Sequence, residues 1–189
     1  MCFFLSAILP KETKMEAIRP IIETYKMGFS PVNNGSIESQ LKSGDIFLRA
    51  TRKTIYCDCD TVIGCESTGT AKRTLMESKK VKKLKKKGWN LTQIDEWIED
   101  RIKTKKSTKG KKWWPELQRK KADEWINFLN ELLEVKSVSR VGLLKHWYQG
   151  NLDSEEIKIR ETKRLDLNQA LFDDLLKMDE DVLYEFYKQ

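Results

Sequence analysis

The fold is decided by a short apolar stretch near the start of the chain, Cys2–Leu9, with the sequence CFFLSAIL. Pro10 follows at once and ends the run, because proline cannot donate a backbone hydrogen bond. A run of this length with apolar side chains on both faces is typical of a central strand of a sheet. We therefore expect this segment to lie in the middle of the fold.

A helix and two further strands are predicted directly after it. Apolar residues recur at helical spacing over residues 15–25, with Thr13 in the position of an N-cap. Pro20 inside this stretch indicates a kink or a later helix start. Residues 29–32 are predicted as a short edge strand, and residues 46–51 (IFLRAT) as a second buried strand.

The order of these elements predicts which strands pair. In a strand–helix–strand–strand unit, the last strand usually lies antiparallel beside the first. Residues 46–56 should therefore run beside residues 2–9, with the end of one strand next to the start of the other.

The last third of the chain adds helices and strands. Pro115 is well placed in the first turn of a strongly amphipathic helix. Residues 138–148 and 155–165 alternate between apolar and polar side chains, which predicts a β-hairpin. A final helix is expected from Asp166 or Asn168 to Met178, and residues 182–187 are expected to add a further turn or two.

Together these elements predict an α+β fold. It has an antiparallel or mixed sheet of about five strands, packed helices and an inserted basic helical hairpin. Residues 1–70 form an N-terminal strand–helix–strand unit with a cysteine loop, and residues 71–114 form the basic hairpin and a hinge. Residues 115–189 complete the same domain as the first segment.

The composition indicates in which compartment of the cell the protein is expected to work. The chain has 189 residues, 34% of them charged, and a formal net charge of +7. No apolar run approaches the roughly 18 residues that a membrane helix needs, and the apolar start lacks the basic region of a signal peptide. We therefore expect a cytoplasmic protein without a membrane partner, in which thiols stay reduced.

A cysteine cluster is the first candidate site. The stretch YCDCDTVIGC, residues 56–65, holds three of the four cysteines, and the predicted strand pairing brings its start close to Cys2. Four thiolates at tetrahedral positions would suit zinc, although this spacing departs from the usual C-x2–4-C pairs. The alternatives are buried structural thiols and a reactive or redox pair. The candidate metal ligands are Cys2, Cys57, Cys59 and Cys65.

Cys2 also suggests a specific form of thiol catalysis. Removal of Met1 would leave a cysteine whose own α-amino group, with a pKa of about 8, can act as general base. In this residue the chain resembles class II glutamine amidotransferases, and the resemblance implies Cys2 as nucleophile. No other catalytic motif is recognisable, and His146, the single histidine, is expected to have a hydrogen-bonded structural role.

A lysine-rich segment is the second candidate site. Residues 72–121 carry 19 Lys and Arg but only 6 Asp and Glu, a density that attracts phosphates. Gly88 separates two predicted helices with helix-turn-helix spacing, but acidic residues on the second helix count against the reading of DNA bases. The alternatives are a solvated lysine face, contact with the acidic last third of the chain, and a protein partner. The candidate polyanion-binding residues are Lys79, Lys80, Lys82, Lys83, Lys85, Lys86 and Lys87.

The sequence therefore predicts a small cytoplasmic binding protein with a Lys-rich helical surface, and nucleic acid is its expected ligand. The alternative is a thiol-dependent enzyme, or a redox or zinc protein, that uses Cys2 or the Cys57/Cys59 pair.

Overall fold

The computed structural model describes residues 2–52, 58, 61–63, 75–76, 78–109, 114–169, 174–175 and 178–188. The chain divides into two compact units. The first contains Met1–Cys65 and Arg119–Gln189, and the second contains Glu66–Gln118. Each unit is described by itself.

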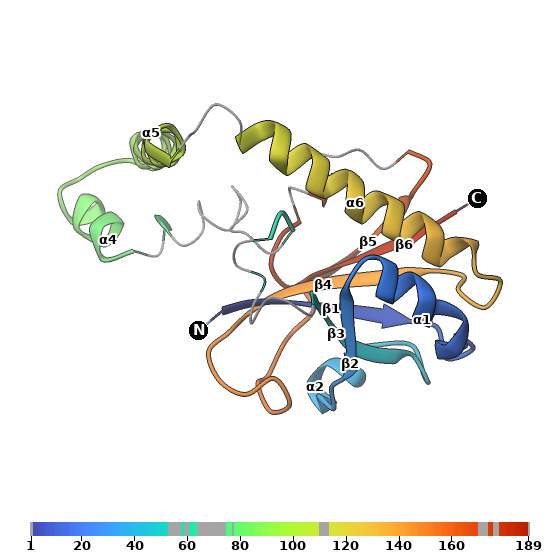
Figure 1. Ribbon diagram of the computed structural model, residues 1–189. Coiled ribbons are helices and arrows are strands. Elements are labelled where there is room, and N and C mark those ends of the chain that lie inside the picture. Colours follow the sequence, from blue (N-terminus) through green and yellow to red (C-terminus); the bar gives the residue numbers. More distant parts are fainter. Residues whose placement is uncertain are drawn as a thin grey trace. The chain divides into compact units, whose positions relative to one another are not determined.

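The first unit is built on a six-stranded mixed sheet (Figure 1). The order of the strands is β2-β3-β1-β4-β6-β5, and only the β5–β6 pair is parallel. The α+β class is therefore confirmed, with six strands where about five were expected. The strands are β1 (Cys2–Leu9), β2 (Met27–Pro31), β3 (Ile46–Arg52), β4 (Val141–Tyr148), β5 (Glu161–Asp166) and β6 (Val182–Tyr187).

β1 is a central strand, as its apolar sequence predicted. It lies between β3 and β4 and is antiparallel to both. Its register with β3 runs from Leu9↔Ile46 to Ser6↔Arg49, so the predicted antiparallel pairing of these two strands is confirmed. Its register with β4 is longer and continues to Cys2↔Tyr148.

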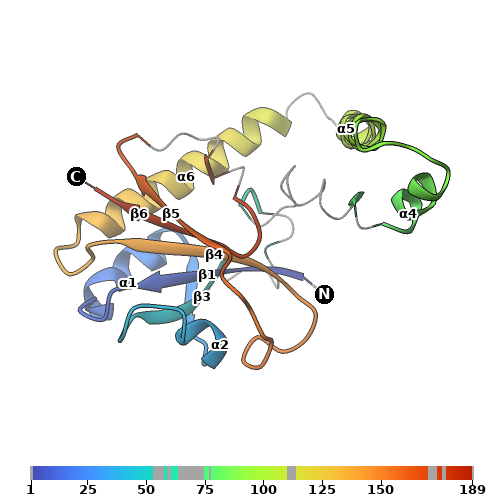
Figure 2. The ribbon, with the colours of Figure 1, turned by 180° about the vertical axis from the view of Figure 1, so that it is seen from behind.

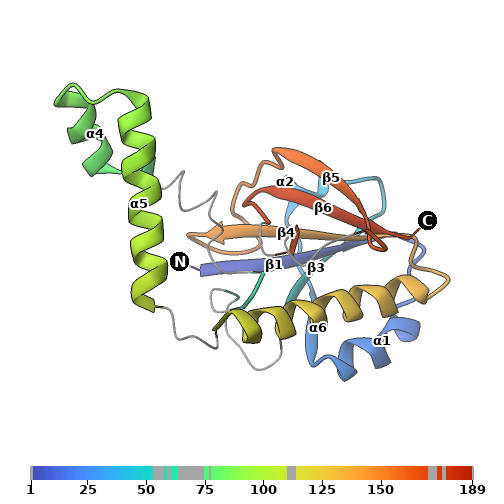
Figure 3. The same cartoon turned by 90° about the horizontal axis from the view of Figure 1, so that it is seen from above.

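Two helices pack on one face of the sheet. Figure 3 shows α1 (Met15–Thr24) and α6 (Trp114–Glu134) on this side and α2 (Gly35–Glu38) on the other. Leu5 of β1 belongs to the same buried cluster as Ile18 of α1 and Phe128 of α6. Thr13 does not cap α1, because its hydroxyl donates to the Ser137 carbonyl and Lys14 takes the N-cap position. Pro20 lies inside the helix, so the helix does not start later.

The other face is covered by α2 and the segment 149–160, which lie side by side in Figure 2. Asn34 fixes both, since its Oδ1 accepts from the backbone N–H groups of Ser36 and Ile37. Its Nδ2 donates to the carbonyls of Leu152 and Glu155, at 2.8 and 3.0 Å. Ile157 contributes to the buried cluster on this face, which also contains Ile8 and Tyr148.

The predicted β-hairpin is wrong. β4 pairs with β1 and β6, whereas β5 pairs with β6 in parallel. The connecting residues 149–160 form hydrogen bonds with side chains near α2, so they do not return the chain beside β4. Alternation shows that a segment has two unlike faces, but it does not identify the neighbouring strand.

The helical turn expected at residues 182–187 is also wrong, because these residues form strand β6. Five of its six residues are buried, which fits a strand with neighbours on both sides. A short apolar run cannot be assigned to helix or strand from periodicity alone. Of the helix expected before it, Asp174 and Leu175 are helical, while residues 170–173, 176 and 177 lie outside the described part of the chain.

The second unit contains a helical hairpin, as predicted. α4 (Lys79–Lys86) is capped by Ser78, whose hydroxyl accepts from the Val81 N–H, and α5 (Leu91–Lys109) follows. Gly88 stands between them with φ of +83°, a conformation that glycine adopts readily. The hairpin has a small core of Val81, Ile94 and Ile98.

Of the helices that the structure describes, none is both long and apolar enough to cross a membrane.

The close approach of strands at Gly142 can be tested by Gly142→Ala. A Cβ at this position would lie 3.0 Å from Ile8 Cβ and 3.1 Å from Leu183 Cδ1. We expect the substitution to lower the free energy of unfolding by about 1–3 kcal/mol in urea denaturation, as overpacking does. Gly35→Ala is the matched control, because nothing lies within 4 Å of its added Cβ. Equal stability of the two variants would contradict the packing described for β1, β4 and β6.

Candidate functional site

Two groups of polar side chains in the first unit lie at one end of the β1–β4 pair. β3 pairs with β1 only as far as Ser6, and β6 pairs with β4 only as far as Leu144. The start of β1 and the end of β4 therefore extend past their outer neighbours while remaining paired with each other. Their outward backbone groups need other partners, because unpaired backbone groups are costly to bury.

Asp58 supplies such partners on the β1 side. Its backbone N–H donates to the Phe3 carbonyl at 2.9 Å, and its Oδ2 accepts from the Leu5 N–H at 2.9 Å. Oδ2 also accepts from the Thr51 hydroxyl at 3.0 Å. Asp58 therefore continues the hydrogen bonding of β1 beyond the point where its pairing with β3 stops.

The environment of the Asp58 carboxyl disfavours its charged form. The residue is 1% exposed, and its Oδ1 has no hydrogen-bond partner among the described residues. Burial raises the pKa of Asp58 to about 6, against the opposing effects of Leu5, Thr51 and the Arg49 charge. A buried carboxyl with a raised pKa and an unpartnered oxygen is a candidate for a functional group.

The predicted cysteine site is described only in part. Cys2 is a half-buried free thiol at the start of β1, opposite Tyr148 in the register. Cys57, Cys59 and Cys65 lie outside the described residues. Asp58, which the sequence places between Cys57 and Cys59, is hydrogen-bonded to the residue after Cys2. A zinc site formed by the four cysteines stays a prediction.

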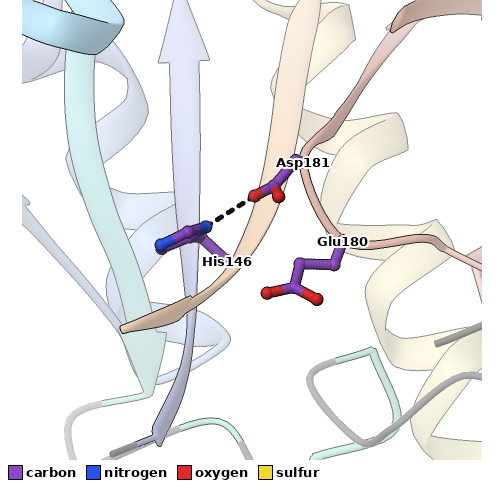
Figure 4. Close-up of side chains that lie close together, drawn as sticks. All are labelled: His146, Glu180 and Asp181. Carbon is purple, nitrogen blue, oxygen red and sulfur yellow. Dashed lines mark hydrogen bonds and ion pairs between the residues drawn. The ribbon is translucent and has the colours of Figure 1, made fainter. Parts of the chain in front are cut away.

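A second group of side chains lies on the β4 side (Figure 4). His146 projects from β4, and Glu180 and Asp181 come from the segment that enters β6. His146 Nδ1 lies 2.5 Å from Asp181 Oδ1, and Glu180 Oε1 accepts from the Trp147 N–H at 3.2 Å. One donor atom from each of the three residues lies within 4.8 Å of the others.

The backbone of Asp181 is fixed on both sides. Its N–H donates to the Lys145 carbonyl at 2.9 Å, and its own carbonyl accepts from the Arg160 N–H at 2.8 Å. Its φ is +60°, which is uncommon for a residue other than glycine but accessible to Asp and Asn. This backbone conformation and its hydrogen bonds hold the carboxylate against His146.

His146 is hydrogen-bonded, as expected, and carboxylates flank both ring nitrogens. Nε2 lies 3.5 Å from Glu155 Oε1, and the Glu155 carboxylate accepts the N–H groups of Gln149 and Gly150. Burial opposes protonation, but the hydrogen bond and charge of Asp181, aided by Glu155 and Glu180, raise the pKa of His146 above its usual 6.5. The sequence offered no indication of this site, because it depends on where β6 meets β4.

At the opposite end of the sheet, a different set of charges is fully paired. Glu185 of β6 is 6% exposed and binds Arg140 Nε at 3.2 Å and Arg164 Nε at 3.1 Å. Arg140 also binds Asp45, and Lys42 Nζ lies 3.6 Å from Glu185. Glu185, Arg140, Arg164 and Lys42 border a hollow of about 430 Å³. The cations here already neutralise a buried carboxylate, which favours a structural role.

The lysine-rich surface of the second unit is exposed, as the sequence predicted. Val81 of α4 is fully buried. Trp89 and Leu91, between the two helices and at the start of α5, are 38% and 66% exposed and are the exposed large hydrophobic residues of the described chain. The exposed lysines are Lys79, Lys80, Lys82, Lys83, Lys85, Lys86 and Lys87.

No protein-family model, curated protein or solved structure matches this chain.

The raised pKa of Asp58 predicts a specific pH dependence of stability. The pKa is 3.8 for an ordinary Asp and about 6 here, so between these values the folded state holds a proton that the unfolded state has lost. The contribution of Asp58 to stability therefore falls as pH rises from about 4 to about 6, by roughly 3 kcal/mol in total.

Asp58→Asn isolates this contribution, since the amide oxygen can still accept from Leu5 and Thr51. The difference in free energy of unfolding between wild type and this variant should shift in favour of the variant across that pH interval. Chemical denaturation at a series of pH values measures it. A difference that does not change with pH would show that the Asp58 carboxyl is not destabilised in its charged form.

Proposed function

We propose that the chain binds nucleic acid through the lysine surface of α4, with Trp89 as an adjoining aromatic contact. The observation that carries this proposal is the exposure of all seven lysines together with Trp89 beside them in the sequence. Lysines that track phosphates, combined with an aromatic ring on which bases stack, are the usual elements of single-strand binding.

The sequence of α4 favours ligand binding over a merely solvated helix. Lysines three and four residues apart, such as Lys79 and Lys83 or Lys82 and Lys86, lie on the same side of a helix. Each such like-charge pair destabilises an isolated helix by about 0.2–0.5 kcal/mol. Binding of a polyanion would relieve this repulsion, whereas a solvated surface gains nothing from it.

The charge of α5 argues for phosphate contact and against the reading of bases in a duplex groove. Glu96, Glu99 and Asp100 are exposed on this helix. Carboxylates on a helix in the major groove would face phosphates at short range and repel them. We therefore expect little sequence preference and a stronger affinity for single strands.

Charge reversal tests the lysine surface. In the variant Lys82→Glu, Lys83→Glu, Lys85→Glu and Lys86→Glu, affinity for a fluorescent single-stranded oligonucleotide should fall roughly tenfold or more, measured by anisotropy. Wild-type affinity should also drop steeply between low and moderate salt, because bound phosphates release counterions.

A matched control makes the same change in net charge, but in the first unit. It reverses exposed residues whose side chains form no described ion pair: Lys14→Glu, Lys26→Glu, Lys136→Glu and Lys158→Glu. This control should bind like wild type. Equal loss in both variants, or an affinity that ignores salt, would contradict the proposal. Trp89→Ala tests the aromatic contact separately. Loss of one stacked base should weaken the binding free energy by about 1–3 kcal/mol.

The second candidate is a thiol-dependent enzyme, or a redox or zinc protein, that uses Cys2 or the Cys57/Cys59 pair. It is favoured by one observation, the hydrogen bond that holds Asp58 and its perturbed carboxyl beside the start of β1. A nearby group that takes up protons near neutral pH suits thiol chemistry.

Alkylation of the native chain tests this candidate. One cysteine should react with iodoacetamide faster than free cysteine at pH 7, because a lowered thiol pKa increases the thiolate fraction. Peptide mass spectrometry identifies the modified residue, and native mass spectrometry reports bound zinc and the loss of Met1. Uniformly slow labelling of all four thiols, with no bound zinc, would rule this candidate out.

A further inference from the structure

We propose that His146, Glu180 and Asp181 form a binding site for one divalent transition-metal cation of the zinc or manganese type (Figure 4). The site lies in the first unit, so it is independent of the lysine surface. Its donors are an imidazole and two carboxylates, and it shares no ligand with the four cysteines.

The geometry of the three donors suits a single cation. They lie within 4.8 Å of one another. Adjacent ligands of a cation with bonds of about 2.1 Å are roughly 3.0–3.4 Å apart, so the three donors need small movements to share one cation. His146 Nδ1 and Asp181 Oδ1 are 2.5 Å apart, a hydrogen-bond distance. A cation would replace the shared proton, move these two atoms slightly apart and draw the Glu180 carboxylate closer.

The surroundings of His146 prepare Nδ1 to act as a ligand. The Glu155 carboxylate faces Nε2, the other ring nitrogen, and two backbone N–H groups hold that carboxylate in place. Metal-binding histidines almost always donate their second N–H to a carboxylate or carbonyl, which fixes the tautomer and the ring orientation. The Tyr148 ring packs edge-on against the imidazole at 4.7 Å between centroids and limits its rotation.

The balance of charge also favours a cation. Three carboxylates, from Glu155, Glu180 and Asp181, surround one imidazole. The guanidinium of Arg160 donates to the backbone carbonyl of Glu180. The carboxylates that face the imidazole would attract a divalent cation.

The donor set narrows the choice of metal. One imidazole with two carboxylates suits zinc and manganese, whereas calcium and magnesium prefer oxygen ligands alone. Manganese is the more informative probe, because thiolates select softer metals and the cysteines would compete poorly for it. Three protein ligands also leave coordination positions for water.

The test is a titration of the full chain with Mn²⁺ at pH 7.5, followed by electron paramagnetic resonance. We expect one bound Mn²⁺ per chain and a loss of affinity of roughly tenfold or more in Asp181→Asn, Glu180→Gln and His146→Ala. Asn tolerates the left-handed backbone at position 181, and Gln can still accept from the Trp147 N–H, so the first two variants preserve the local hydrogen bonds.

Two further variants separate binding from folding. Glu156→Gln changes an exposed neighbour of Glu155 and should leave affinity unchanged. Glu155→Gln should weaken Mn²⁺ binding about 10–100-fold, because the amide cannot accept the Nε2–H of the imidazole as the carboxylate does. The melting temperature of the metal-free protein should stay near that of wild type, because the amide oxygen can still accept from the Gln149 and Gly150 N–H groups.

Three outcomes would overturn the proposal. They are the absence of stoichiometric Mn²⁺ binding, binding that persists in both Asp181→Asn and Glu180→Gln, and binding that is abolished by Cys2→Ser but not by those two variants. Since no nucleic acid is present in the titration, its result does not depend on the function proposed for the lysine surface.

Discussion

The antiparallel pairing of β1 with β4 is the constraint on which the rest of the first unit depends. It runs from Cys2↔Tyr148 to Ile8↔Gly142, and both halves of the sheet attach to its outer edges. The outer strands β3 and β6 pair along only part of it. One end of the pair therefore needs hydrogen-bond partners that no strand supplies, and this requirement brings acidic side chains to it.

Two carboxylates meet that requirement, one on each side. The Asp58 carboxylate accepts from the Leu5 N–H of β1, and the Glu180 carboxylate accepts from the Trp147 N–H of β4. At the opposite end of the sheet, buried Glu185 is neutralised by Arg140 and Arg164. The two ends of the sheet therefore differ in how their charged side chains are paired. One is a closed ion-pair network, while the other concentrates carboxylates around a single histidine, the composition that metals and protons exploit.

The sequence correctly predicted the elements that are determined by residues close together in the chain. β1 and β3 were predicted because each is a compact apolar run, and the α4–α5 hairpin because Gly88 separates two helical patterns. The strand at β6 was missed because its six residues have no distinctive period, and the hairpin failed because alternation does not name a partner strand. The polar sites could not be predicted either, because they depend on which distant segments lie side by side. Asp58 and Leu5 are 53 residues apart, and His146 and Asp181 are 35 apart, so only the register brings them together.

The second unit presents the reverse case, in which the functional candidate was visible in the sequence because it is a local concentration of charge. Among the residues that the structure describes, the buried core of its hairpin consists of Val81, Ile94 and Ile98, and a core of three buried side chains stabilises little. Repulsion among the α4 lysines opposes the helix that presents them. A ligand that binds the folded hairpin better than the unfolded segment stabilises it by mass action. On the proposal that a polyanion binds α4, folding of the helix and binding of the ligand are coupled, because the lysine charge that weakens the free helix would stabilise the complex.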